Sequence, residues 1–373
     1  MSQSSSPPPP SIDAASSQGQ KRRLADANVT PCGRQKAQKT HPYIGLGRHF
    51  ARTVSAFTPV VNIINHGLVR DGSDQPRSTY TIHENRMWDA FQELDKLHPG
   101  LVDWLLDGDD NPTEVAKYLK AGMTKARSDD TNGLKKAICE WVMALNVGTS
   151  GPKVALNSKI GRGFYHPVYG RLLCPVELDW DDEEVKTALL GGTATVDGEP
   201  VDGSHFPQFL YEGTYNDDAP WVGLLRGPLL IKGYKHIFIS PSSADASDGD
   251  TQTRRSGNAQ LHGMMTVTLA SLAYVAVQTY FALSSQSTFS AHAKGLDIHG
   301  LYNAVLDYLE DPDEAADVAD LLAWWNRTIF PGHHKKSLGG HGKGPGTMGR
   351  LKAARAKRQR QDGDVLTNCI NRA

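Results

Sequence analysis

The residue types best suited to chemistry gather in one polar segment, between residues 254 and 262. Arg254 and Arg255 stand before a Gly-Asn turn that leads into an uncharged, largely apolar stretch. Two guanidinium groups, together with the free backbone amides of a helix entrance, can bind an anion. A nearby His262 could move a proton. We take His262, Arg255 and Asn258 as candidate catalytic residues, and Arg254 and Arg255 as candidate anion-binding residues.

The same segment also has a purely structural explanation. Gly257 and Asn258 would make the turn, the two arginines would pair with an acidic surface, and His262 would cap a helix or pack. Polar clusters mark functional sites in only a proportion of proteins. Both explanations therefore stay open at the level of the sequence.

No standard catalytic or metal-binding signature occurs in the sequence. It contains neither G-x-S-x-G nor H-E-x-x-H, and no histidine is followed two positions later by Asp or Glu. The glycine-rich run 339–344 lacks the spacing of a phosphate loop, and the acids of 179–184 lack that of a calcium loop. The four cysteines form no close pair, which favours a reducing compartment. We expect no metal and no cofactor.

A basic segment near the C-terminus carries the clearest functional signal. Lys357, Arg358 and Arg360 form the compact pattern that nuclear import receptors bind, and Lys352 and Arg355 extend it. A merely solubilising tail is the alternative. We therefore predict a nuclear location reached through an import receptor, with the cytoplasm as the alternative location.

The two ends of the chain differ in charge from its middle. Residues 1–40 hold six Lys and Arg against two Asp, and residues 332–361 hold nine Lys and Arg without an acid. Residues 362–373 carry −1, and the whole chain has a formal net charge of −1, so residues 41–331 carry −13. Because an acidic body repels phosphate, any weak nucleic-acid contact is expected to involve the tails.

Hydrophobic spacing predicts a mainly α fold, with one helical globular domain, a loop-rich insertion, minor β structure and disordered termini. The expected organisation is a disordered basic Ser/Pro-rich tail over 1–40, a partly ordered lead-in over 41–78, the helical domain over 79–331 and a disordered basic tail over 332–373. Whether residues 148–220 form a separate lobe stays open.

Apolar periodicity and capping residues predict the individual helices. They are expected over 81–97, 101–106, 112–123, 134–145, 181–190, 267–283 and 296–309, from Pro228 onward, and after a cap at Asp311 followed by Pro312. A hairpin is expected over 164–173, and a strand is possible over 236–240. The uncharged stretch 256–293 is interrupted by Thr, Ser and Gln, which favours a buried core helix and no membrane span.

Several short motifs resemble those of one domain family. They are Gly163-Phe164-Tyr165-His166-Pro167, Leu173-Cys174-Pro175, Leu178-Asp179-Trp180, Phe209-Leu210-Tyr211-Glu212, Tyr234-Lys235-His236-Ile237-Phe238, Ser240-Pro241-Ser242-Ser243, Arg255-Ser256-Gly257-Asn258, His262-Gly263-Met264, Leu309-Glu310-Asp311-Pro312-Asp313-Glu314 and Trp324-Trp325-Asn326-Arg327. In order and spacing they resemble an uncharacterised domain family expanded in mushroom-forming basidiomycete fungi. The resemblance covers about residues 81–331 and implies no activity, fold or catalytic residue.

Two functional hypotheses follow from these observations. The first is a non-enzymatic nuclear interaction protein, with an acidic helical body that binds a protein partner and basic tails for import or weak nucleic-acid contact. The second is an enzyme that acts on an anionic substrate at Arg254, Arg255, Asn258 and His262. The second requires His262 and an arginine to meet in one concave pocket with another titratable group.

Overall fold

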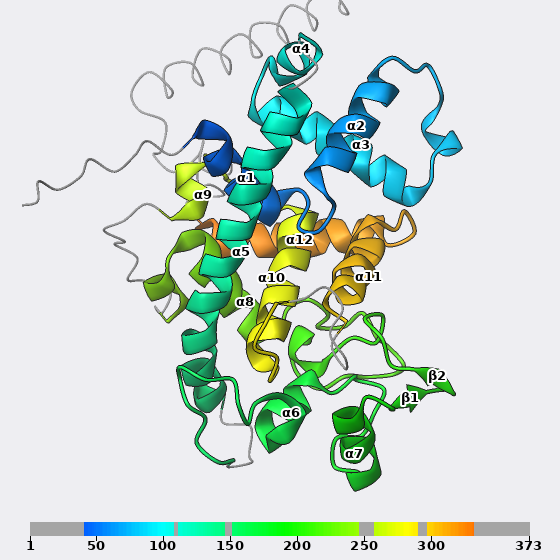
Figure 1. Ribbon diagram of the computed structural model, residues 1–373. Helices are drawn as coiled ribbons and strands as arrows, with labels where there is room; N and C mark the ends of the chain where they lie inside the picture. Colours follow the sequence, from blue (N-terminus) through cyan, green and yellow to red (C-terminus); the bar gives the residue numbers. More distant parts are fainter. Residues whose placement is uncertain (1–40, 108–110, 146–150, 246–256, 290–296, 332–373) are drawn as a thin grey trace, which may run out of the picture. The chain divides into compact units, whose positions relative to one another are not determined.

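The computed structural model describes residues 41–107, 111–145, 151–245, 257–289 and 297–331, and nearly all of its regular elements are helices (Figure 1). The mainly α fold class expected from the sequence is thus confirmed. Among the described residues, no helix combines the length and the apolar composition that a bilayer crossing needs.

The first group of helices packs on the beginning of one long helix (Figure 1). It comprises α1 (Pro42–Thr53), α2 (Val60–Asp71), α3 (Ile82–Leu97) and α4 (Leu101–Leu106), and the long helix is α5 (Asn111–Ala144). Helix α3 begins where expected, because Thr81 accepts a hydrogen bond from the Glu84 amide at 3.2 Å and the Glu84 carboxylate accepts one from the Thr81 amide at 2.8 Å. Phe50, Ile64 and Leu119 belong to the hydrophobic core of this group.

Helices α1 and α5 cross at a very short distance. A Cβ atom on Gly47 would lie 2.2 Å from the Leu119 carbonyl oxygen, and a Cβ atom on Gly122 would lie 2.2 Å from the Ile44 carbonyl oxygen. Any side chain at either glycine would collide with backbone of the other helix. The two glycines therefore allow this close packing.

The structure corrects the expectation of two helices between residues 112 and 145, because α5 is a single helix of 34 residues. The polar stretch around Asp130 resembles a break in the sequence, but Asp130 is buried. Its carboxylate accepts hydrogen bonds from Arg52 of α1 at 2.7 and 2.8 Å, and one from the Tyr274 hydroxyl at 2.7 Å. These tertiary contacts, which local propensity cannot show, hold the helix together.

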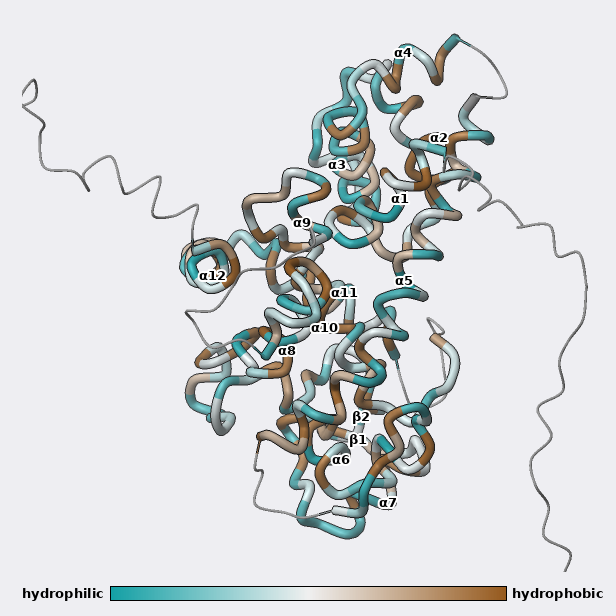
Figure 2. Tube along the Cα trace, turned by 90° about the vertical axis from the view of Figure 1, so that its left-hand side faces the viewer, coloured by the Kyte–Doolittle hydropathy of each residue, from teal (hydrophilic) through white to brown (hydrophobic). Residues whose placement is uncertain are grey.

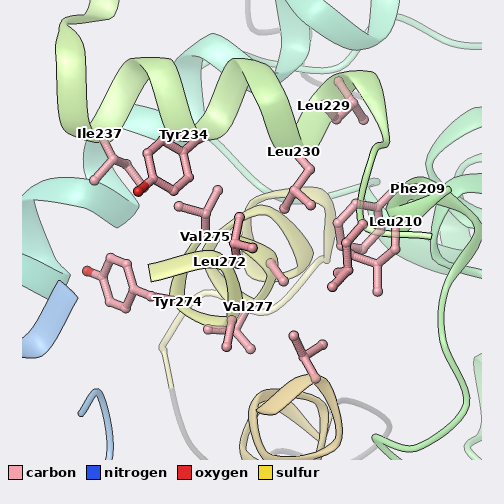
Figure 3. Close-up of a cluster of buried hydrophobic side chains, with 14 of the residues drawn as sticks. Phe209, Leu210, Leu229, Leu230, Tyr234, Ile237, Leu272, Tyr274, Val275 and Val277 are labelled. Atoms are coloured by element: carbon pink, nitrogen blue, oxygen red, sulfur yellow. The ribbon is translucent and has the colours of Figure 1, made fainter. Parts of the chain in front are cut away.

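The second group of elements surrounds the apolar helix α10. It comprises α6 (Pro167–Leu173), α7 (Glu183–Gly191), β1 (Thr195–Val196), β2 (Glu199–Pro200), α8 (Pro228–Tyr234), α9 (Asn258–Leu261), α10 (Leu269–Leu283), α11 (Ile298–Glu310) and α12 (Ala315–Ile329). Figure 3 shows Leu230 and Tyr234 of α8 directed toward Leu272 and Val275 of α10. Helix α12 is amphipathic and, seen end-on in Figure 2, is brown on one side and teal on the other. The expected core helix is thus present.

Two expected β elements are helical instead. The prediction of a hairpin over 164–173 is wrong, because Pro167 starts α6. The His166 ring caps this helix by accepting a hydrogen bond from the Val168 amide at 3.1 Å. The possible strand over 236–240 is a π-helical turn (Lys235–Ile239) that continues α8. Among the described residues, the only sheet is the antiparallel pair β1–β2.

The expected start of the last helix is also displaced. Helix α12 begins at Ala315, and Asp311 ends α11 instead of capping α12. The Asp311 carboxylate accepts a hydrogen bond from the Asp313 amide at 2.9 Å, which forms a tight turn before the helix.

Candidate functional site

A cleft of about 760 Å³ lies where α1, α3, the α9–α10 connection and α11 meet. We call it the interhelical cleft. Ala90, Tyr302 and Leu306 are buried residues of its lining, and His83 and Asp89 are exposed ones. Ala90 belongs to the first hydrophobic core and Tyr302 to the second. The cleft therefore depends on the packing of both groups of helices.

Two stacked histidines form part of its wall. The rings of His49 and His262 are nearly parallel, at 14°, with centroids 4.4 Å apart. His49 is on the buried side of α1, and His262 ends α9 just before Gly263, whose φ of +66° turns the chain toward α10. Burial, then His262 and Arg52, lower the pKa of His49 to about 4. Burial, then Arg52 and Arg48, lower the pKa of His262, so both rings are neutral near pH 7.

Arg86 connects the two groups of helices across the cleft. Its Nε lies 2.6 Å from a Glu310 carboxylate oxygen and its Nη2 lies 2.7 Å from a carboxylate oxygen of Asp307, both on α11. The other acids of the lining also have cationic partners, because Asp89 pairs with Arg77, and Glu93 pairs with Lys96. These last two pairs are largely exposed, so solvent screens them.

The structure separates the candidate residues chosen from the sequence. His262 lies in the cleft, together with Arg86 and further titratable groups. The Asn258 side chain instead donates a hydrogen bond to the Ile237 carbonyl oxygen, within the π-helical turn. That turn shifts the hydrogen-bonding register and leaves carbonyl groups in need of donors, which explains the role of Asn258. Asn258 is not part of the cleft lining.

The remaining candidates lie outside the described residues. They are Arg254, Arg255, Lys352, Arg355, Lys357, Arg358 and Arg360. Sequence reasoning missed His49, Arg86 and Glu310, because they come from three helices far apart in the chain and share no spacing. A histidine on the apolar side of a helix, such as His49, was the one available signal.

A second cavity, of about 560 Å³, is lined by several of the motif residues, including Cys174, Pro175 and Trp180. Burial and the nearby Asp179 raise the pKa of the Cys174 thiol to about 12, so it is protonated and a poor nucleophile. Trp180 packs so closely on Gly170 that a Cβ atom there would lie 2.1 Å from the indole ring. Packing accounts for these residues, and the interhelical cleft is the stronger candidate.

Metal binding finds no support in the described part of the chain. No three residues among His, Cys, Asp and Glu there come together in a way that could hold a metal ion. The stacked arrangement of His49 and His262 places their faces, not their nitrogen lone pairs, toward each other.

Comparison with known proteins identifies the domain. Residues 121–330, more than half of the 373-residue chain, match the model of a family of unknown function (DUF6698). The chain belongs to this family. No curated protein and no solved structure matches the chain. The DUF6698 match includes His262 and Glu310 of the cleft, whereas His49 and Arg86 precede it.

Proposed function

We propose that this DUF6698 protein is a non-enzymatic nuclear interaction protein that binds a protein partner in the interhelical cleft. The observation that carries the proposal is that Arg86 is held in ion pairs and that His49 and His262 stack on each other. Arg86 is paired with Asp307 and Glu310, and in the described part of the chain neither His49 nor His262 has a carboxylate partner. General base catalysis by histidine usually relies on such an orienting group. A preformed concave surface with apolar residues suits binding.

A capture experiment with the full chain tests the binding site. The variant Ala270→Trp places a large ring in the cleft wall, and Val69→Trp places the same ring on an exposed position of α2 outside the cleft. We expect partners captured from nuclear extract by the wild type to be lost with Ala270→Trp and kept with Val69→Trp. Equal capture by both variants, at equal unfolding temperature, would show that the partner binds elsewhere.

For the tails we propose nuclear import and weak nucleic-acid contact, because both are cationic beside an acidic body. Deleting residues 352–361 from a fluorescent fusion should abolish nuclear enrichment. Deleting residues 339–344, which removes Gly-rich sequence with a single Lys, is the control. Because the basic residues of 21–39 could act redundantly, a double variant with these changed to Gln completes the test. Nuclear enrichment of the double variant would contradict the import proposal.

The enzyme hypothesis retains one supporting observation, the position of His262 in a cleft that also contains Arg86. Asn258 does not join them, because it is bound to the Ile237 carbonyl. A panel of phosphorylated and carboxylated compounds tests this second candidate. If the protein is an enzyme that acts at this site, the wild type turns over at least one of these compounds and the His262→Gln variant does not.

We further propose that DUF6698 is the family expanded in mushroom-forming basidiomycete fungi. The support is the set of motifs between residues 163 and 327, which lies within the matched range. Counting family members across fungal genomes tests it, and an even distribution over all fungi would argue against it.

A further inference from the structure

The described part of the chain ends at a groove that adjoins the interhelical cleft. Phe330, next to the last described residue, lines a groove of about 490 Å³ between α9 and the end of α12. Gly263, Met264 and Met265 line this groove and the cleft as well. The two hollows are therefore neighbours with a common wall. The last described residue, Pro331, follows Phe330 at the groove.

The charges of the cleft and of the C-terminal segment are complementary. Residues 350–360 contain six Lys and Arg and no acid, whereas the cleft lining holds three carboxylates, Glu310 on α11 and Asp89 and Glu93 on α3, against the single cation Arg86. Asp89 and Glu93 keep 51% and 46% of their side chains exposed. Their present partners, Arg77 and Lys96, are exposed as well. An incoming guanidinium group can therefore approach the same carboxylates.

The length of chain between the two sites permits an intramolecular contact. Residues 332–349 separate the described end from the basic segment, and 18 residues span up to about 60 Å when fully extended. A tethered segment meets its site at a high effective concentration, up to the millimolar range for short linkers. Weak individual ion pairs can therefore suffice for occupancy.

We propose that the basic segment 350–360 docks in the interhelical cleft of its own chain, between Asp89 and Glu93 of α3 and Glu310 of α11. The inference rests on the function proposed for the cleft and for the basic segment. Docking in cis hides the import signal from its receptor, and a partner that enters the cleft releases it. Partner binding and nuclear import are then coupled. The partner competes with the basic segment for the cleft, and the import receptor competes with the cleft for the basic segment.

Site-specific photo-crosslinking of the full-length chain tests the contact. The probe is p-benzoylphenylalanine in place of Met265, which is 57% exposed and lines the cleft, and the control probe replaces Val69, which is 79% exposed on α2. We expect mass spectrometry to find probe 265 joined to peptides from residues 350–360 of the same molecule, and probe 69 not joined to them. Absence of these peptides at probe 265 overturns the proposal.

A matched pair of charge reversals makes the test specific. Glu93→Lys changes an acid of the cleft wall that pairs with Lys96, and Glu183→Lys changes an acid of α7 that pairs with Lys186 at the same i,i+3 spacing. We expect Glu93→Lys to reduce the intramolecular crosslink at least fivefold and Glu183→Lys to leave it unchanged. Raising the salt concentration from 0.1 to 1 M should weaken it in the wild type. Equal yields in the two variants, or no response to salt, overturn the proposal.

Two further outcomes are separable. A crosslink that grows with protein concentration and joins two chains shows a second copy in the cleft and overturns docking in cis. If the crosslink is absent while Ala270→Trp still abolishes partner capture, the inference fails and the proposed function stands. If the crosslink is present while capture is insensitive to Ala270→Trp, the proposed function fails instead.

Discussion

Asp130 of α5 joins α1 and α10 through one buried carboxylate. Its carboxylate binds Arg52 through two hydrogen bonds and also accepts one from Tyr274, and both ionic side chains are buried. Asp130→Ala should lower the free energy of unfolding by about 3–5 kcal/mol, because it leaves the Arg52 charge buried and unpaired. Asp129→Ala, which removes an exposed partner of Arg48, should cost less than about 1 kcal/mol. Urea denaturation measures both, and similar costs would contradict the assignment.

The lowered pKa of His49, one of the two stacked histidines, predicts that the stability of the fold depends on pH. The pKa of His49 is about 4 in the folded protein and 6.5 as its ordinary value, so between these values the unfolded chain binds more protons. Stability from this group is complete above pH 6.5 and is lost as the pH falls toward 4, by up to about 3 kcal/mol. The variant His49→Phe should flatten this part of the profile, whereas His83→Gln, at an exposed position of the cleft, should not. An unchanged profile in His49→Phe would refute the explanation.

At the level of the helices, Gly47 and Gly45 of α1 test how much the crossing of α1 and α5 depends on close packing. Gly47→Ala should destabilise the protein by more than about 2 kcal/mol, because its Cβ would overlap the Leu119 carbonyl. A Cβ on Gly45 would meet no atom within 4 Å, so Gly45→Ala should be neutral or gain up to about 1 kcal/mol from helix propensity. Thermal unfolding compares them. Equal effects would mean that the helices can move apart freely.

For the molecule as a whole, the structure makes α1 and α2 part of the helical body. Residues 41–331 should fold cooperatively, whereas residues 79–331 should aggregate, because Val115 and Leu119 lose their cover and Asp130 loses Arg52. Size-exclusion chromatography and circular dichroism of the two fragments measure this. A monomeric 79–331 fragment with the unfolding temperature of 41–331 would show that the first two helices are dispensable.

Local signals in the sequence were enough for several elements. The Thr81–Glu84 pair with its apolar stripe defined α3, Pro228 marked the start of α8, and the uncharged stretch before residue 284 became the core helix α10. Each of these signals lies within one or two helical turns, where spacing and capping chemistry decide the backbone conformation. The acidic body and cationic ends follow from composition alone.

Only the tertiary structure decided the continuity of α5, the π-helical turn and the cleft. Asp130 favours a break by its local sequence, but Arg52 and Tyr274 bury and neutralise it from elements far along the chain. Packing likewise brings His49, Arg86 and His262 together in the cleft. Asn258 instead donates a hydrogen bond to the Ile237 carbonyl oxygen, 21 residues earlier in the chain. Burial and ion pairing between distant segments depend on three-dimensional distance, which residue spacing along the chain does not contain.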